Sequence, residues 1–195
     1  MRDLFDQLLA LIGILVLLPV FILISLWIIL DSKGGAFYVQ KRVGLNRKPF
    51  GLIKFRTMLP NSDKKGMLTV GARDPRVTKA GYFLRKYKLD ELPQLFNVLN
   101  GTMRLVGPRP EVEEYVNLYT EEQMKVLSVK PGITDYASLR YFKESELLAT
   151  SKDPRQIYIE EIMPAKIRMN LEYLERKSFG EDLKIIFKTL ARILS

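Results

Sequence analysis

The chain has 195 residues, of which 47% are apolar, and this is enough for one domain with a buried core. It contains no Cys and no His. These absences exclude disulfides, thiolate nucleophiles, zinc sites built from Cys or His, and Ser-His-Asp triads. Any catalysis must therefore use carboxylates, hydroxyls, Lys or Arg, and any metal ion would be a hard cation bound by oxygen.

The formal net charge of +9 is concentrated in the middle of the chain. Residues 33–109 carry 17 Lys or Arg against 4 Asp or Glu, a net charge of +13, whereas the segments before and after them each carry −2. So basic a segment is expected to attract phosphate, nucleic acid or an acidic membrane surface.

Residues 8–30 form an apolar run of 23 residues without an ionisable group, long enough for a helix that crosses a bilayer. Pro19 lies at its centre and cannot donate to the carbonyl of Leu15, so a kink is expected there. The run is either a kinked spanning helix or a re-entrant helix, broken at Pro19, that leaves by the face it entered. Hydropathy alone favours spanning, because backbone groups freed at mid-membrane need partners. Either way, the basic remainder belongs on the cytoplasmic side.

Residues 36–58 are expected to form two strands around a turn at residues 44–49. On the second strand, Lys54 and Arg56 share one face. They are either the solvated cations of an edge strand or a pair of cations that face a diphosphate. Residues 58–76 are rich in Asn, Asp, Lys, Gly and Pro, which predicts a mobile loop.

A short helix is expected over residues 78–87, and a second helix near Asp90, since Pro93 is tolerated only in a first turn. Asp90 and Glu91 then lie at the positive end of that second helix. A lone Asp-Glu there usually caps the helix. Among neighbours such as Arg85, the two acids are either neutralised partners or a carboxylate nucleophile with a metal ligand. Nearby cations are expected to keep such a nucleophile ionised.

Arg109 lies between Pro108 and Pro110, and the two prolines stiffen the backbone around it. An isolated Pro-Arg-Pro is ordinarily a turn with an exposed Arg. A guanidinium held in place is also well suited to bidentate phosphate binding.

Five segments together resemble the bacterial sugar transferase family, the monotopic phosphoglycosyl transferases that act on polyprenyl phosphate. They are KLDELPQL at residues 88–95, LVGPRP at 105–110, VKPGIT at 129–134, and the segments 37–58 and 183–190. The resemblance covers nearly the whole chain, and five ordered motifs are far more specific than any one of them.

The resemblance implies a two-step transfer of a sugar-1-phosphate from a nucleotide diphosphosugar, usually a UDP-sugar, to polyprenyl (undecaprenyl) phosphate. Asp90 would be the nucleophile and form a phosphosugar-aspartyl intermediate with release of UMP, and Glu91 would be catalytic and bind Mg²⁺. The charge pattern agrees, because cations are needed to offset the repulsion between phosphates and a carboxylate. The candidate phosphate-binding residues are Lys54, Arg56, Arg85 and Arg109.

The resemblance also implies an α+β fold with a membrane helix, a small β-hairpin and several short amphipathic helices at the membrane interface. It favours re-entry at Pro19, with residues 1–33 embedded in the membrane and residues 34–195 as a catalytic domain on the cytoplasmic face of the bacterial inner membrane. Membrane lipid is then an expected partner and nucleic acid is not. A homodimer is one alternative for the oligomeric state. Leu18 and Asp135 replace the usual Ser and Gly, and Asp135-Tyr136-Ala137-Ser138 replaces the common Gly-Leu-Ala-Gln. That second change bears on sugar or nucleotide preference.

Residues 111–127 and 155–177 are expected to form amphipathic helices that mainly serve packing. A last helix from about Glu181 would place Leu183, Ile186, Phe187, Leu190 and Leu194 on one face, directed either to the core or to an anionic membrane surface. An alternative of another class is a membrane-anchored basic protein that binds nucleic acid or anionic lipid. Such a protein would not need Asp90.

Overall fold

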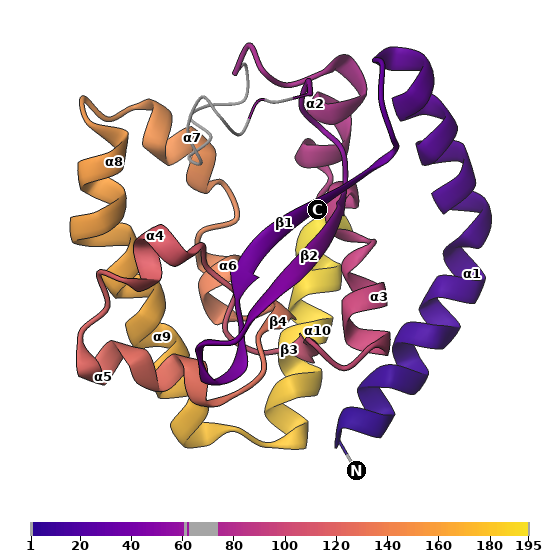
Figure 1. Ribbon diagram of the computed structural model, residues 1–195. Helices are drawn as coiled ribbons and strands as arrows, with labels where there is room; N and C mark the ends of the chain where they lie inside the picture. Colours follow the sequence, from indigo (N-terminus) through magenta and orange to yellow (C-terminus); the bar gives the residue numbers. More distant parts are fainter. Residues whose placement is uncertain (1, 61, 63–73, 195) are drawn as a thin grey trace.

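The computed structural model describes residues 2–60, 62 and 74–194. Its described part mixes helices with two small sheets, which confirms the predicted α+β class, the apolar N-terminal helix and the hairpin. Figure 1 shows the N-terminal helix along one edge of the molecule, the hairpin in the middle and a group of helices on the far side.

Helix α1 (Arg2–Asp31) covers the whole apolar run. It is the one helix among the described residues that is long and apolar enough to cross a membrane. The helix continues through Pro19, and Figure 1 shows it bowed near its middle, so the hairpin break expected at this residue in a membrane stays a prediction. The proline removes a single hydrogen bond, and those on either side of it maintain the helix.

One face of α1 packs against the rest of the protein along its length. Ala10 lies in a hydrophobic cluster with Leu52 and Val98, and Phe21 lies in a second cluster with Phe55 and Leu84. The opposite face is apolar and exposed, with Leu15, Val16, Leu23, Leu26 and Leu30 each at least half exposed. The helix therefore has one side bound to the domain and one side suited to lipid.

Polar contacts hold both ends of α1 to the same body. Near the start, Asp6 Oδ2 accepts a hydrogen bond from Arg104 Nε at 2.7 Å, and both side chains are buried. At the far end, Asp31 Oδ2 accepts from the backbone N–H of Ala80 at 2.9 Å. These contacts are two turns or more from Pro19, so the bow of the helix lies between two fixed ends.

The hairpin consists of β1 (Phe37–Val43) and β2 (Pro49–Phe55), which pair antiparallel from Phe37 with Phe55 to Val43 with Pro49. A 3₁₀ turn (Leu45–Arg47) joins them, with Asn46 and Arg47 in the left-handed region. The predicted strands and turn are confirmed.

The predicted loop 58–76 begins and ends on a pairing between its two arms. Met58 bridges Val77, and the backbone N–H of Leu59 donates to Arg76 at 2.9 Å. Residues 61 and 63–73, most of the predicted loop, lie outside the described residues.

Helix α2 (Lys79–Lys86) matches the predicted short helix, with Thr78 Oγ1 capping the N–H of Gly81. The next predicted helix begins later than expected. A separate 3₁₀ turn (Leu89–Glu91) comes first, and α3 (Gln94–Leu99) begins only after Pro93. Pro93 lacks an N–H and cannot donate to the carbonyl of Leu89, so the helix continues only beyond it.

A second sheet of two short parallel strands was not predicted. Strand β3 (Arg104–Val106) pairs with β4 (Gly132–Thr134) beside two glycines. A Cβ atom on Gly132 would lie 2.0 Å from the backbone N of Gly107, so no side chain fits there. This contact places the Pro-Arg-Pro segment after β3 next to the chain that leaves β4.

The remainder is helical, and a hydrophobic cluster formed by Val112, Tyr115, Leu148, Ile162 and Ile167 holds its far side together. Residues 111–127, predicted to be helical, form short helical pieces and not one continuous helix. The elements are α4 (Glu113–Val116), α5 (Glu121–Met124), a 3₁₀ turn (Lys125–Ser128), α6 (Tyr136–Arg140), α7 (Glu144–Ala149), α8 (Pro154–Ile157), a π-helical turn (Tyr158–Ile162), α9 (Met163–Arg176) and α10 (Phe179–Leu194).

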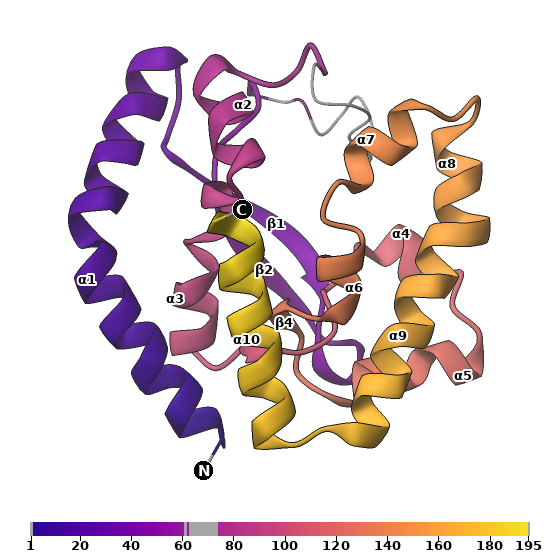
Figure 2. The same cartoon turned by 180° about the vertical axis from the view of Figure 1, so that it is seen from behind.

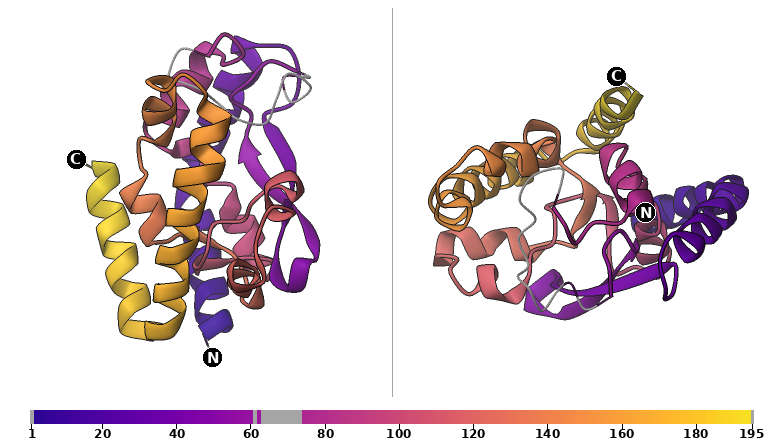
Figure 3. Two further views of the ribbon diagram at one scale, coloured as in Figure 1. Left: turned by 90° about the vertical axis from the view of Figure 1, so that its left-hand side faces the viewer. Right: turned by 90° about the horizontal axis from the view of Figure 1, so that it is seen from above.

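Figures 2 and 3 show α10 on the face of the molecule opposite the hairpin. Its predicted apolar face lies only partly in the core, since Ile186 packs against a hydrophobic cluster with Ile185. Ile185 is fully buried, whereas Phe187 is 67% exposed and Leu190 is 52% exposed. The last helix thus packs through Ile185, whereas the side chains of Phe187 and Leu190 are exposed.

Candidate active site

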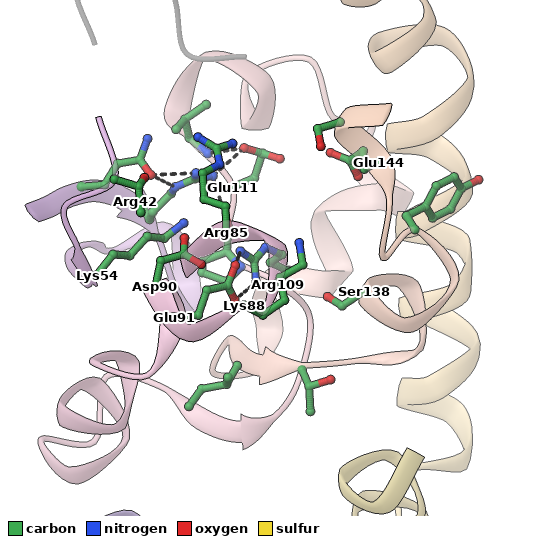
Figure 4. Close-up of a pocket in the computed structure, with 18 of the residues that line it drawn as sticks. Arg42, Lys54, Arg85, Lys88, Asp90, Glu91, Arg109, Glu111, Ser138 and Glu144 are labelled. Carbon is green, nitrogen blue, oxygen red and sulfur yellow. Dashed lines mark hydrogen bonds and ion pairs between the residues drawn. The ribbon is translucent and has the colours of Figure 1, made fainter. Parts of the chain in front are cut away.

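A pocket of about 530 Å³ opens between the hairpin, the turn that carries Asp90, and helices α6, α7 and α9. The predicted site residues Lys54, Arg56, Arg85, Asp90, Glu91 and Arg109 all line it. Figure 4 shows Lys54, Asp90, Glu91 and Arg109 close together on one side of this pocket. The structure therefore brings together residues that are up to 55 positions apart in the chain.

Asp90 owes its position to an unusual backbone turn. Lys88 adopts a left-handed conformation with φ 56°, and the chain then forms the 3₁₀ turn that contains Asp90. A non-glycine residue in this region stores strain, and such residues cluster at functional sites. Asp90 is only 9% exposed, and its Oδ1 has no hydrogen-bond partner among the described residues. A buried carboxylate oxygen without a partner is rare in proteins.

Burial raises the pKa of Asp90, and the neighbouring Glu91 raises it further. Lys54, Arg85 and Lys88 act in the opposite direction. The cations therefore act on the pKa in the predicted direction, and the net shift is upward because removal from water costs the charged form more. An ionised Asp90 in this setting is a poorly solvated anion, which is a reactive one.

Glu91 forms a bidentate ion pair with Arg109. Arg109 Nη1 donates to Glu91 Oε2 at 2.8 Å, and Nη2 donates to Oε1. Although burial acts the other way, Arg109 and Lys54 hold the pKa of Glu91 far below its usual range. Glu91 is thus an anion at any physiological pH, and the two residues predicted to bind metal and phosphate separately are partners here.

Arg109 is fixed by more than its two prolines. Its backbone N–H donates to Oδ2 of Asp135 at 3.1 Å. Asp135 is fully buried and also caps α6 by accepting from the N–H of Ser138 at 2.5 Å. The Asp that stands where relatives of this sequence were expected to have Gly therefore connects the Arg109 loop to α6.

Lys54 is a cation without a hydrogen bond or salt bridge to any described residue, although Glu91 and Asp90 lie nearby. Burial lowers the pKa of Lys54 to about 8. Burial likewise lowers the pKa of Arg85, which faces Asp90. Each of these cations lines the pocket with donors free to receive an anion.

Arg56 does not accompany Lys54 as the strand pattern predicted. Its guanidinium donates to the carbonyl of Gly35 at 2.6 Å, and to the hydroxyl and carbonyl of Ser32 at 2.8 and 2.9 Å. Strand β2 ends at Phe55, so the alternation of side chains does not continue to residue 56. Arg56 thus secures the segment after α1, and phosphate binding by this residue stays a prediction.

The sequence did not identify a second ion pair in the pocket. Arg42 Nη1 donates to Glu111 Oε1 at 2.8 Å, and the hydroxyl of Tyr158 donates to Oε2 of the same carboxylate. Although burial opposes it, Arg42 lowers the pKa of Glu111. These residues are 69 and 47 positions apart, and nothing in their local patterns relates them.

The donors present fit a hard cation that takes most of its ligands from a substrate. Within the described part of the chain, no cluster of three or more acidic residues could hold a metal by itself. Mg²⁺ is commonly bound by one or two carboxylates together with substrate phosphates and water. Asp90, with its unpartnered oxygen, and the ionised Glu91 beside it supply such a pair.

The whole chain, residues 1–195, matches the family described as bacterial sugar transferase. The UDP-glucose:undecaprenyl-phosphate glucose-1-phosphate transferase of Xanthomonas campestris pv. campestris is 36% identical over 194 residues, which are 97% of this chain and 38% of that protein. The UDP-N-acetylgalactosamine-undecaprenyl-phosphate N-acetylgalactosaminephosphotransferase of Aeromonas hydrophila is 35% identical over 193 residues, 97% of this chain and 43% of that protein.

This chain thus spans less than half the length of those two relatives. The uncharacterized sugar transferase EpsL of Bacillus subtilis (strain 168) is closer to it in size, being 38% identical over 195 residues that are 100% of this chain and 87% of that protein. The predicted family is confirmed over the full sequence, including every segment that forms the pocket. The chain belongs to the bacterial sugar transferase family.

Proposed function

We propose that this protein transfers a sugar-1-phosphate from a UDP-sugar to polyprenyl phosphate, the first membrane step in the assembly of a glycoconjugate. The names of two of its relatives describe this reaction for glucose and for N-acetylgalactosamine. The observation that carries the proposal is Asp90, a buried carboxylate with an unpartnered oxygen in a pocket lined by Lys54, Arg85 and Arg109.

In the first step, an oxygen of ionised Asp90 attacks the β-phosphorus of the UDP-sugar. The bond from this phosphorus to the bridging oxygen breaks, UMP leaves with the electron pair, and the sugar phosphate remains bonded to Asp90. Lys54 and Arg85 offset the negative charge of the two phosphates as they approach the carboxylate. The poor solvation of Asp90 favours the attack, because little water has to be displaced from it.

In the second step, a phosphate oxygen of polyprenyl phosphate attacks the phosphorus of the aspartyl intermediate. The bond between this phosphorus and Asp90 breaks, so the carboxylate is regenerated and the polyprenyl diphosphosugar leaves. Arg109, held by Glu91 and Asp135, would contact both phosphates in turn. A guanidinium fixed in this way stabilises each transition state without having to reorganise.

Mg²⁺ is part of the proposal. When bound, it would neutralise charge on the phosphate oxygens, and Asp90 and Glu91 would hold it. Glu91 can retain a hydrogen bond from Arg109 while its other lone pairs face the metal.

A re-entrant arrangement of α1 is supported by the contacts at its ends. Asp6 and Asp31 bind the two ends of the helix to one body, whereas the exposed face between them is apolar. A helix that crossed the bilayer would carry one end away from the domain and break one of these contacts. We therefore place the domain at the cytoplasmic face of the bacterial inner membrane, with the bow of α1 in the lipid.

The alternative is a basic protein that binds nucleic acid or anionic lipid through its charge, and it does not explain where the cations lie in the structure. Such binding depends on exposed cations spread over a surface. Here Arg104 is buried with Asp6, and Lys54, Arg85 and Arg109 line a pocket around a carboxylate.

Release of UMP tests the proposal. The full chain in detergent is supplied with a UDP-sugar panel, undecaprenyl phosphate and Mg²⁺, and UMP is measured with and without excess EDTA. We expect release by the unchanged protein, loss of release on metal removal, and at least a 1,000-fold loss, about 4 kcal/mol, in Asp90→Asn. Asp153→Asn, the same change at an exposed helix cap, is the control. Turnover by Asp90→Asn at the unchanged rate would reject the mechanism.

A further inference from the structure

The pocket continues beyond the catalytic turn into a region that the proposed phosphate chemistry does not use. Ser138 on α6 and Asn170 on α9 both line the pocket, and neither has a role in the proposed phosphate chemistry. Figure 4 shows Arg109 between Asp90 and Ser138. A ligand whose phosphate rests at Asp90 and Arg109 would therefore extend toward Ser138.

Both side chains have polar atoms that nothing satisfies. The hydroxyl of Ser138 and the side-chain oxygen of Asn170 have no hydrogen-bond partner in the described part of the chain. Asn170 is only 5% exposed. Buried polar groups are almost always hydrogen-bonded, so two unpartnered groups in the wall of one pocket indicate a ligand that completes them.

Two of the cations that line the pocket are paired with acids. Lys166 Nζ binds Glu144 Oε2 at 2.8 Å, and Arg42 binds Glu111 at 2.8 Å. Ser138 and Asn170 add an uncharged hydroxyl and an uncharged amide to the wall of the pocket, whereas the cation Lys88 contacts the ring of Phe142. The chemistry of the two uncharged groups suits a neutral ligand rich in hydroxyl groups.

Asp135 fixes the position of this region relative to the phosphate site. One oxygen of its carboxylate accepts from the N–H of Arg109 and the other accepts from the N–H of Ser138. Because a single side chain holds both residues, the distance from Arg109 to Ser138 cannot vary much. The sugar of a UDP-sugar is bonded directly to the β-phosphate, so its ring must lie within one ring width of the groups that hold that phosphate.

From this geometry we infer that Ser138 and Asn170 form the subsite that recognises the hydroxyl or acetamido groups of the donor hexose. The inference rests on the proposed function, since it takes the β-phosphate to lie at Asp90. It assigns the choice of sugar to α6 and α9, and leaves the chemistry to the residues around Asp90. Asp135 acts as a positioning residue between the two.

Donor selectivity tests this subsite. The full chain in detergent is assayed for UMP release with UDP-glucose, UDP-galactose, UDP-N-acetylglucosamine and UDP-N-acetylgalactosamine, each with undecaprenyl phosphate. The variants are Ser138→Ala and Asn170→Leu, which remove hydrogen bonding and keep similar volume. Ser128→Ala is the matched control, because its hydroxyl is exposed and lies outside the pocket.

We expect the ratio of kcat/KM between the preferred donor and the others to change roughly fivefold or more in each variant, the effect of one hydrogen bond. The control should leave the ratio unchanged. An equal loss for all four donors, or no change, would overturn the subsite. If Asn170→Leu fails to fold, as judged by thermal unfolding, the ratio of kcat/KM measured with Ser138→Ala tests the subsite by itself. If the unchanged protein releases no UMP from any donor, the proposed function fails, and the subsite fails with it.

Discussion

Asp6 on α1 and Arg104 on β3 are 98 residues apart in sequence and form a buried ion pair of 2.7 Å. Two further acids lie within 4 Å of the same guanidinium, Asp3 at 3.5 Å and Asp182 at 3.9 Å. This cluster joins the N-terminal apolar helix to β3 and α10, so the start of α1 is part of the folded body.

Asp6→Asn should destabilise the protein by about 3 kcal/mol, because it removes the nearest acid of the buried Arg104 guanidinium and leaves only Asp3 and Asp182, at 3.5 and 3.9 Å, to compensate its charge. For a chain of this size the midpoint of thermal unfolding should fall by roughly 6 to 12 °C, measured in detergent. Glu122→Gln is the control, since its partner Lys125 and Glu122 itself are both more than 60% exposed. That change should cost less than about 0.5 kcal/mol. Equal midpoints for Asp6→Asn and the unchanged protein would show that the pair does not hold the helix.

Single cysteines introduced at Arg2 and Lys33 test the arrangement of α1 in a chain that contains no other Cys. Lys33 is exposed, and both sites lie just outside the buried contacts at the two ends of the helix. In sealed inverted membrane vesicles, an impermeant thiol reagent should label both sites, because the cytoplasmic face is outward. A cysteine introduced at the exposed Lys125 shows on which side of the membrane the domain lies. Labelling of Lys33→Cys and Lys125→Cys without Arg2→Cys would mean that α1 spans the bilayer.

The pH dependence of kcat/KM for the UDP-sugar should reflect the protonation state of Lys54. Its pKa of about 8 means that the free protein loses this positive charge as the pH rises through 8. The value of kcat/KM for the UDP-sugar, which reflects the free enzyme, should therefore fall above pH 8 by up to tenfold per pH unit. In Lys54→Arg the guanidinium stays charged, and the decline should move to a higher pH. A decline at the same pH in both proteins would assign it to another group.

Local sequence patterns were enough to predict several parts of this structure. The apolar run, the hairpin around residues 44–49 and the short helix capped by Thr78 all depend on neighbours within a few positions. Asp90 could be selected because its motif, read with the others, resembles one family. Each of these elements and motifs depends on residues that are close together in the sequence.

The remaining parts depend on contacts between distant residues. Strands β3 and β4 have three residues each, too few for a pattern, and they are held by the close approach of Gly107 and Gly132. The pairing of Glu91 with Arg109 depends on that contact, since it positions the Pro-Arg-Pro loop. Asn170 lies in a helix that the sequence assigns mainly to packing, and its place in the pocket follows from the tertiary fold.

The measurement that tests the account most directly is the mass of the intact protein after incubation with a UDP-sugar and Mg²⁺, with polyprenyl phosphate withheld. We predict an increase equal to one sugar phosphate, mapped by peptide analysis to Asp90 and lost when undecaprenyl phosphate is added. Asp90→Asn should show no increase, and Asp153→Asn should match the unchanged protein. An unmodified mass in a preparation that turns over normally with both substrates, or an adduct on another residue, would contradict the assignment of Asp90 as the nucleophile.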